Sequence, residues 1–181
     1  MTGTIYELAE EALRLARGAG LTITTAESCT GGLVAGALTE VPGSSEAFDR
    51  GLVTYSNAAK TALLGVSETM LAEHGAVSEA VARAMAEGAL AAAGAGVAVA
   101  ITGVAGPGGG TATKPVGLVH FAAARRGRPT LHRERRFGDL GRSEVRRRSV
   151  IEALTLLCQA LGVEAARKTP SRREEARHPP A

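Results

Sequence analysis

The sequence predicts a single α/β domain in which a mixed β-sheet is flanked by helices in three layers. Three observations favour this fold class. Helical and strand-like segments alternate in the first half of the chain, a continuous apolar segment of strand length follows at 96–102, and Gly-Arg-Pro then joins two further strand-like segments. Alternation is typical of parallel strands connected by helices, and a late hairpin adds antiparallel strands. We expect the domain to cover 1–162 and a charged, disordered tail to cover 163–181.

The spacing of apolar residues and the capping residues predict each element in turn. Helices show one apolar stripe and end at glycines, whereas strands are short and β-branched or continuously apolar. In chain order we expect a helix at 6–17, a strand at 21–25, a helix beginning near Thr30, a strand at 50–56, helices capped by Asn57, Ser67 and Ser78, a central strand at 96–102, an edge hairpin within 116–137 and a helix at 143–161.

The composition is typical of a soluble globular domain with a core of small aliphatic residues. Hydrophobic residues make up 45% of the chain, aromatic residues only 3%, and Trp is absent. No apolar run approaches the ~20 residues that a membrane span requires, and the amino terminus lacks a signal pattern. We therefore expect a cytoplasmic protein. Cys29 and Cys158 are too few for a disulfide framework or a zinc site.

The net charge of +3 is unevenly distributed along the chain. Ten arginines but only three acidic residues lie within 125–148, so the remainder is net acidic. A region of this kind fits a nucleic acid, a phosphate-bearing ligand or a solvated face. Phe137 is its only aromatic residue, which gives little support for base stacking. Nucleic acid is therefore not the partner we expect.

Three polar segments follow three of the predicted strands: “TAESCTGG”, “TYSNAAK” and “TGVAGPGGG”. Ligands of open α/β sheets gather at the carboxyl ends of strands, so we expect these segments to meet there. In the first segment, free N–H groups near Thr30 would favour an anion or a developing oxyanion, and Gly31 would allow close approach to the backbone. The alternative is a simple helix cap.

Lys60 in “TYSNAAK” is the candidate base. Burial lowers the pKa of a lysine, and a serine paired with a neutral lysine is a known form of activated nucleophile. Two serine groups are candidate partners: Ser28 and the Ser44–Ser45 pair, and spacing does not decide between them. Tyr55 could relay a proton or fix the lysine. An ordinary surface lysine is the alternative.

Metal and dinucleotide motifs do not occur in the sequence. The four histidines do not cluster along the chain, and HExxH and CxxC are absent, so we expect no metal and no cofactor. The glycines that begin at Gly103 are spaced G-x-x-G-x-G, which is neither the dinucleotide fingerprint nor the Walker sequence.

Taken together, the motifs resemble the CinA C-terminal domain family over roughly residues 5–161. The resemblance rests on “TTAESCTGG”, “PGSSEAFDRGLVTYSNAAK”, “LAEHGAVSEAVARAMAEGAL”, “AITGVAGPGGGTATKPVGLVHFA” and a later arginine, Arg142, in this order. It implies a metal-free serine–lysine hydrolysis of the carboxamide of nicotinamide mononucleotide, to nicotinic acid mononucleotide and ammonia. The partner it implies is therefore a small-molecule pyridine nucleotide.

The same resemblance implies roles for individual residues. On the matching positions, Ser45 is the nucleophile, Lys60 the base and Tyr55 an assisting group. The substrate-binding residues that we expect are Ser28, Thr30, Gly31, Thr102 and Arg142. Two alternatives remain open, a non-catalytic nucleotide-binding module and binding of nucleic acid through 125–148. The Ala- and Leu-rich helices could also form the face of a homodimer.

Overall fold

The computed structural model describes residues 5–162, so the tail expected at 163–181 lies outside the described residues. The elements are, in chain order, α1 (Ile5–Ala19), β1 (Ile23–Glu27), α2 (Leu33–Thr39), the 3₁₀ helix η1 (Ser44–Glu46), β2 (Phe48–Val53), α3 (Asn57–Leu64), α4 (Glu68–His74), α5 (Glu79–Ala93), β3 (Val97–Gly103), β4 (Leu118–Arg125), β5 (Leu131–Arg136) and α6 (Arg142–Gly162).

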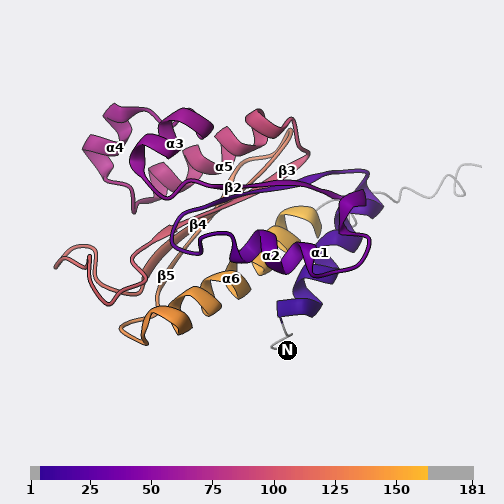
Figure 1. The fold of residues 1–181 in the computed structure, drawn as a ribbon. Coiled ribbons are helices and arrows are strands. Elements are labelled where there is room, and N and C mark those ends of the chain that lie inside the picture. Colours follow the sequence, from indigo (N-terminus) through magenta and orange to yellow (C-terminus); the bar gives the residue numbers. More distant parts are fainter. Residues whose placement is uncertain (1–4, 163–181) are drawn as a thin grey trace, which may run out of the picture.

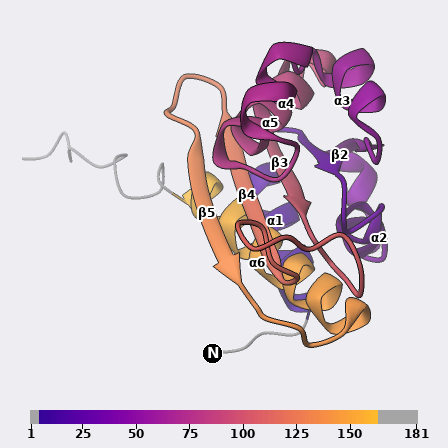
Figure 2. The same ribbon diagram turned by 90° about the vertical axis from the view of Figure 1, so that its left-hand side faces the viewer.

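A mixed five-stranded sheet forms the middle layer, with the strand order β2-β1-β3-β4-β5. β1 is parallel to both β2 and β3, whereas β4 is antiparallel to β3 and to β5. Helices α1, α2 and α6 lie on one side of the sheet, and α3, α4 and α5 lie on the other (Figures 1 and 2). The predicted mixed sheet flanked by helices is confirmed, including the edge position of the hairpin.

The two faces of the sheet carry side chains of different size. Val97, Val99 and Ile101 of β3 belong to the larger core, which contains α1 and α6. Ala98 and Ala100 of the same strand face the Ala-rich α5 in a second core. Side chains of a strand alternate between faces, so one apolar run supplies both cores. The methyl groups let α5 lie close to the sheet.

Close packing also fixes α3, the helix that carries Lys60. A Cβ added at Gly88 of α5 would lie 1.9 Å from the carbonyl oxygen of Leu64 at the end of α3. Only glycine therefore allows the two helices this contact. The position of Lys60 consequently depends on a glycine that lies outside every polar segment.

The second helix begins later than the sequence predicts. We expected a start near Thr30, but α2 begins at Leu33. Gly31 and Gly32 have φ angles of +59° and +96°, a left-handed backbone that cannot continue a right-handed helix. Instead, the N–H of Gly31 donates to the carbonyl of Ser28 at 3.0 Å and closes a turn before the helix.

The predicted caps of the next three helices can be compared with the structure. Ser67 and Ser78 are confirmed as N-caps of α4 and α5. The expected cap Asn57 is wrong by one residue, because Ser56 accepts the hydrogen bond from the N–H of Ala59. Asn57 is instead the first residue of α3.

Within residues 5–162, no helix combines the length and apolar character needed to cross a bilayer.

Candidate active site

A cavity of about 270 Å³ opens where the parallel strands end. Its walls come from the turn after β1, the β2–α3 segment, the α4–α5 loop, the glycine-rich loop after β3 and the first residue of α6. Five of the predicted site residues line it: Ser28, Tyr55, Lys60, Thr102 and Arg142. Parallel strands bring their carboxyl ends to one edge of the sheet, which explains why segments far apart in the sequence meet here.

Lys60 lies at the centre of the polar contacts in this cavity. Its side chain is only 1% exposed, and its Nζ donates to Ser28 Oγ at 3.2 Å. The same nitrogen donates to the carbonyl oxygens of Thr54 and Tyr55, at 2.9 Å and 3.3 Å. No carboxylate of the described chain forms an ion pair with it. Burial therefore lowers the pKa of Lys60.

Glu27 fixes the turn that carries Ser28. It ends β1 and is fully buried, and its carboxylate accepts hydrogen bonds from the main-chain N–H groups of Gly32, Val34 and Ala35, at 2.8–3.1 Å. A carboxylate is a favourable partner for the unpaired donors at the start of a helix. Glu27 thus joins β1 to α2 and leaves Ser28 at the edge of the cavity.

Tyr55 and Arg142 lie at the rim. The Tyr55 side chain is 60% exposed, and its hydroxyl accepts a hydrogen bond of 3.0 Å from Arg142 Nη2. Arg142 Nη1 donates to the carbonyl of Gly106 in the glycine-rich loop, also at 3.0 Å. Tyr55 therefore contacts Lys60 through its carbonyl and contacts the rim through its hydroxyl. The Oγ1 of Thr102, on the inner wall, donates to the carbonyl of Ala76 at 2.8 Å.

Ser45 does not lie beside Lys60, contrary to our expectation. It lies in η1, before β2 begins, whereas Lys60 follows the end of β2. The six residues of β2 span roughly 20 Å. Arg17 at the end of α1 also binds η1, through the carbonyl of Gly43 and the carboxylate of Glu46. Ser45 is thus at the opposite end of the sheet from the cavity.

Thr30 and Gly31 lie next to the cavity but do not line it. Thr30 is fully buried, and its hydroxyl has no hydrogen-bond partner among the described residues. A Cβ at Gly31 would lie 3.4 Å from the guanidinium of Arg146 on α6. The main chain of Thr30 is buried together with its side chain, so this structure does not bring Thr30 to the cavity, whereas Gly31 is exposed. A contact between the main chain of Gly31 and a substrate remains a prediction.

Two lining residues, Ala76 and Val77, lie outside the three polar segments and had no predicted role at the site. Asn57 lies in one of these segments, but only a capping role was predicted for it. Ala76 and Val77 directly precede Ser78, the cap of α5. The predicted N-cap at Ser78 marks the start of α5, and it is thus the signal that could have drawn attention to the loop before this helix.

Several side chains of the arginine-rich region form ion pairs or hydrogen bonds within the chain. Glu152 pairs with Arg133 and Arg135, and Glu144 pairs with two arginines of α6. Arg125 is buried and donates to the last carbonyls of α6. These contacts give several of the arginines a role within the fold, and binding of nucleic acid by this region remains an untested alternative.

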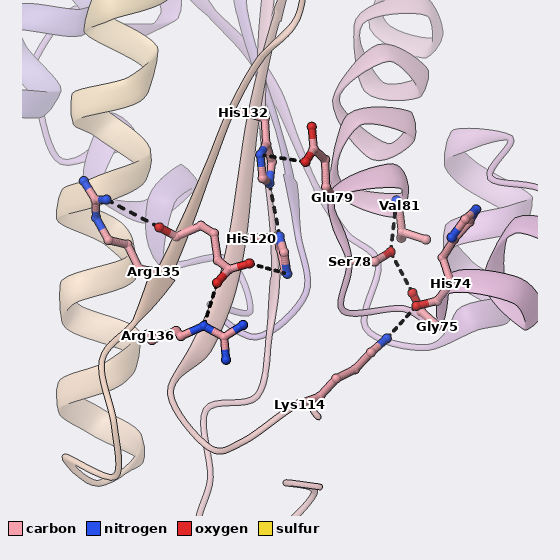
Figure 3. Close-up of polar contacts among 11 residues, drawn as sticks. His74, Gly75, Ser78, Glu79, Val81, Lys114, His120, His132, Arg135 and Arg136 are labelled. Atoms are coloured by element: carbon pink, nitrogen blue, oxygen red, sulfur yellow. Dashed lines mark hydrogen bonds and ion pairs between the residues drawn. The ribbon is translucent and has the colours of Figure 1, made fainter. Parts of the chain in front are cut away.

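A second group of titratable side chains lies on the α5 side of the sheet, outside the cavity. His120 Nδ1 and His132 Nε2 are 3.1 Å apart. Glu134 Oε2 lies 3.8 Å from the other nitrogen of His120, and Glu79 Oε2 lies 3.4 Å from that of His132. Figure 3 shows the two rings pointing toward one another between β4, β5 and α5. Burial lowers the pKa of both histidines. Within residues 5–162, no three such side chains form a group that could hold a metal ion.

Comparison with known proteins gives a consistent result. A family model described as the CinA C-terminal domain matches residues 5–161. The chain is 51% identical over 156 residues to the nicotinamide-nucleotide amidohydrolase PncC of Escherichia coli, which covers 86% of this chain and 93% of that protein. It is 56% identical over 143 residues to a CinA-like protein of Mycolicibacterium vanbaalenii, but spans only about a third of its length, since 34% of that protein and 79% of this chain are covered.

Solved structures show the same similarity. The crystal structure of the competence/damage inducible protein CihA from Agrobacterium tumefaciens matches with a TM-score of 0.85 and 54% identity, over 88% of this chain and 96% of that one. That of the competence damage-inducible protein A from Klebsiella pneumoniae matches with a TM-score of 0.83 and 40% identity, over 88% of this chain and 98% of that one.

Proposed function

We propose, from the premise that this chain belongs to the CinA C-terminal domain family, that it is an amidohydrolase. The substrate is nicotinamide mononucleotide, whose carboxamide is hydrolysed. The products are nicotinic acid mononucleotide and ammonia. The Escherichia coli relative, which is named for this activity and matches this chain over nearly its whole length, supports this assignment.

The observation that carries the proposal is the set of oxygens around Lys60 Nζ. A neutral amine has two N–H donors and one lone pair. The carbonyls of Thr54 and Tyr55 accept the two donors, which leaves the lone pair for the hydroxyl of Ser28, 3.2 Å away. Burial favours this neutral form. We therefore assign the nucleophile to Ser28 in place of Ser45, and the base to Lys60.

The chemistry then balances with water as the only co-reactant. Ser28 Oγ forms a bond to the carboxamide carbon, its proton passes to Lys60, and the π electrons of the carbonyl move to its oxygen. When the intermediate collapses, the C–N bond breaks and Lys60 returns the proton to the leaving nitrogen, so ammonia departs. Water attacks the resulting ester, with Lys60 as base again, and the acid leaves as Ser28 regains its proton.

The remaining wall residues have binding roles in this proposal. Arg142 offers a guanidinium at the rim, where charge-assisted hydrogen bonds suit a ribosyl phosphate. A phosphate there would compete with the Tyr55 hydroxyl for the guanidinium. Thr102, tied to Ala76, shapes the inner wall, and the glycine-rich loop leaves space beside it.

The direct test is turnover of nicotinamide mononucleotide by the purified protein. We expect ammonia and the acid product in equal amounts. Calorimetric binding of the nucleotide without product formation would instead identify a non-catalytic nucleotide-binding module. Neither binding nor turnover would reject both assignments.

A further inference from the structure

We propose that the main-chain N–H of Cys29 stabilises the negative charge that develops on the carboxamide oxygen, and that Arg146 is the positioning residue that holds the turn carrying this N–H. This inference rests on the proposed function, because it presupposes attack by Ser28 on an amide. It concerns a residue of α6 that lies outside the cavity lining and that no predicted role covers.

The first step is an account of the N–H groups around Ser28. The N–H of Ser28 donates to a carbonyl of β3, and that of Gly31 donates to the carbonyl of Ser28. Glu27 occupies three donors at the start of α2. Among the main-chain hydrogen bonds of the described residues, none uses the N–H of Cys29. Cys29 also lines the cavity.

The second step is the contact through which Arg146 of α6 binds the turn that carries the Cys29 N–H. Arg146 Nε donates to the carbonyl of Cys29 at 3.1 Å, and its Nη2 donates to the carbonyl of Thr30 at 2.9 Å. The N–H and C=O of a trans peptide point in opposite directions. The bond between the Ser28 carbonyl and the N–H of Gly31 therefore orients the N–H of Cys29, which belongs to the same peptide as that carbonyl. Because Thr30 is fully buried, the two bonds from Arg146 hold the turn against α6 and present no N–H of Thr30 to the cavity.

The third step is the chemistry that such an arrangement supports. The N–H of the residue that follows a serine nucleophile is a common oxyanion donor, and here that residue is Cys29. α2 itself does not supply the site, because Glu27 already occupies its first donors.

The test compares Arg146→Ala with Arg147→Ala, using nicotinamide mononucleotide as substrate. Arg147 is the next residue on α6 and contacts Glu144 at the surface, so it is a matched control. We expect Arg146→Ala to lower kcat by on the order of 10²-fold, with KM changed less than about threefold, because the donor acts mainly in the transition state. Arg147→Ala should keep the wild-type kcat.

Chemical rescue separates positioning from general damage. We expect guanidinium chloride, at concentrations that leave the fold intact by circular dichroism, to restore part of the kcat of Arg146→Ala and none of that of Ser28→Ala. A wild-type kcat in Arg146→Ala, or a loss confined to KM, overturns the proposal. If Arg146→Ala does not fold, Arg146→Lys takes its place, and a wild-type kcat there overturns it. Absence of turnover in the wild-type protein would instead reject the proposed function.

Discussion

Lys60 and the His120–His132 pair are titratable and lie on the same side of the sheet, Lys60 and His120 buried and His132 partly buried, but their surroundings differ. The nitrogen of Lys60 meets one hydroxyl and two carbonyl oxygens. The outer nitrogens of the histidine pair each face a carboxylate, Glu134 on β5 and Glu79 on α5. Arg83 of α5 and Lys114 in the loop before β4 add positive charge near the pair.

The difference indicates which group can transfer a proton during a reaction. Hydroxyl and carbonyl oxygens serve the neutral amine of Lys60 as well as its charged form, so it can lose and regain a proton without losing partners. Glu134, His120, His132 and Glu79 form a row with three contacts between neighbouring side chains. A hydrogen bond at each contact needs one proton, but two neutral imidazoles supply only two. Carboxylates favour the charged form of a neighbouring histidine. The pair is therefore suited to holding α5 against β5, and Lys60 to catalysis.

The largest expected effect is the loss of activity in Lys60→Met. Removing the base, or the nucleophile in Ser28→Ala, should lower kcat/KM by roughly 10³-fold or more, because the two groups act as a unit. Ser45→Ala, at the other end of β2, should stay within about twofold of wild type. The measurement is ammonia release from nicotinamide mononucleotide. Wild-type activity in Lys60→Met would reject Lys60 as the base. A large loss of activity in Ser45→Ala would return the role of nucleophile to Ser45.

The position of Ser45 shows where sequence reasoning reached its limit. Ser45 and Lys60 lie in one continuous motif, and the resemblance to the family implied their pairing, although spacing did not decide between Ser28 and the Ser44–Ser45 pair. The serine precedes a strand and the lysine follows it, so that strand separates them in space. Ser28, far from Lys60 in sequence, follows β1, and the parallel pairing of β1 with β2 places Glu27 opposite Val53. The predicted strands indicated which polar segments follow a strand. Only the strand order, in which β1 and β2 are neighbours, shows that Ser28 and Lys60 lie close together.

The sequence predicted some other features of the fold and of the site, but not all of them. The run at 97–101 predicted a buried central strand, because its apolar side chains leave no face for water. Glycines with left-handed φ delayed the start of α2, which apolar spacing does not reveal. Arg146 stands in a run of three arginines, and its neighbours bind Glu144 at the surface. Nothing in composition distinguishes it, because only the packing of α6 against the Ser28 turn does.

The next effect in size is the pH dependence of catalysis. The reaction requires neutral Lys60, so kcat/KM should rise about tenfold per pH unit and level off at the pKa of this lysine. Burial lowers that pKa, so the plateau should begin below the usual lysine value of about 10.4. The profile of His120→Gln should coincide with that of wild type. A limb near the usual histidine value that disappears in His120→Gln would break the comparison between the two regions.

A smaller effect is expected on stability as the pH falls from 7 to 5.5. Both histidines have lowered pKa values in the folded protein, chiefly through burial, so the unfolded chain binds more protons over this interval. The free energy of unfolding should therefore decrease with falling pH, by on the order of 1 kcal/mol. Urea unfolding at several pH values measures this slope.

The control for this slope is the double variant His120→Gln/His132→Gln, in which it should flatten. Arg147 and Arg148 hold the pKa of Glu144 at about 2, so that carboxylate stays ionised over the interval and does not contribute. A slope that is unchanged in the double variant would assign it to other groups.

The smallest expected effect isolates one carboxylate of the pair. In Glu79→Gln the oxygen near His132 loses its charge, which removes a contribution that raises the pKa of this histidine against burial. The pKa of His132, followed by NMR, should fall further, whereas kcat of the amide hydrolysis should not change. Because Glu79 begins α5 directly after the Ala76–Ser78 loop, a change in kcat would show that the histidine pair and the cavity are coupled through that loop. The two regions would then have to be treated as one titrating system, and the separation between a catalytic and a structural base would fail.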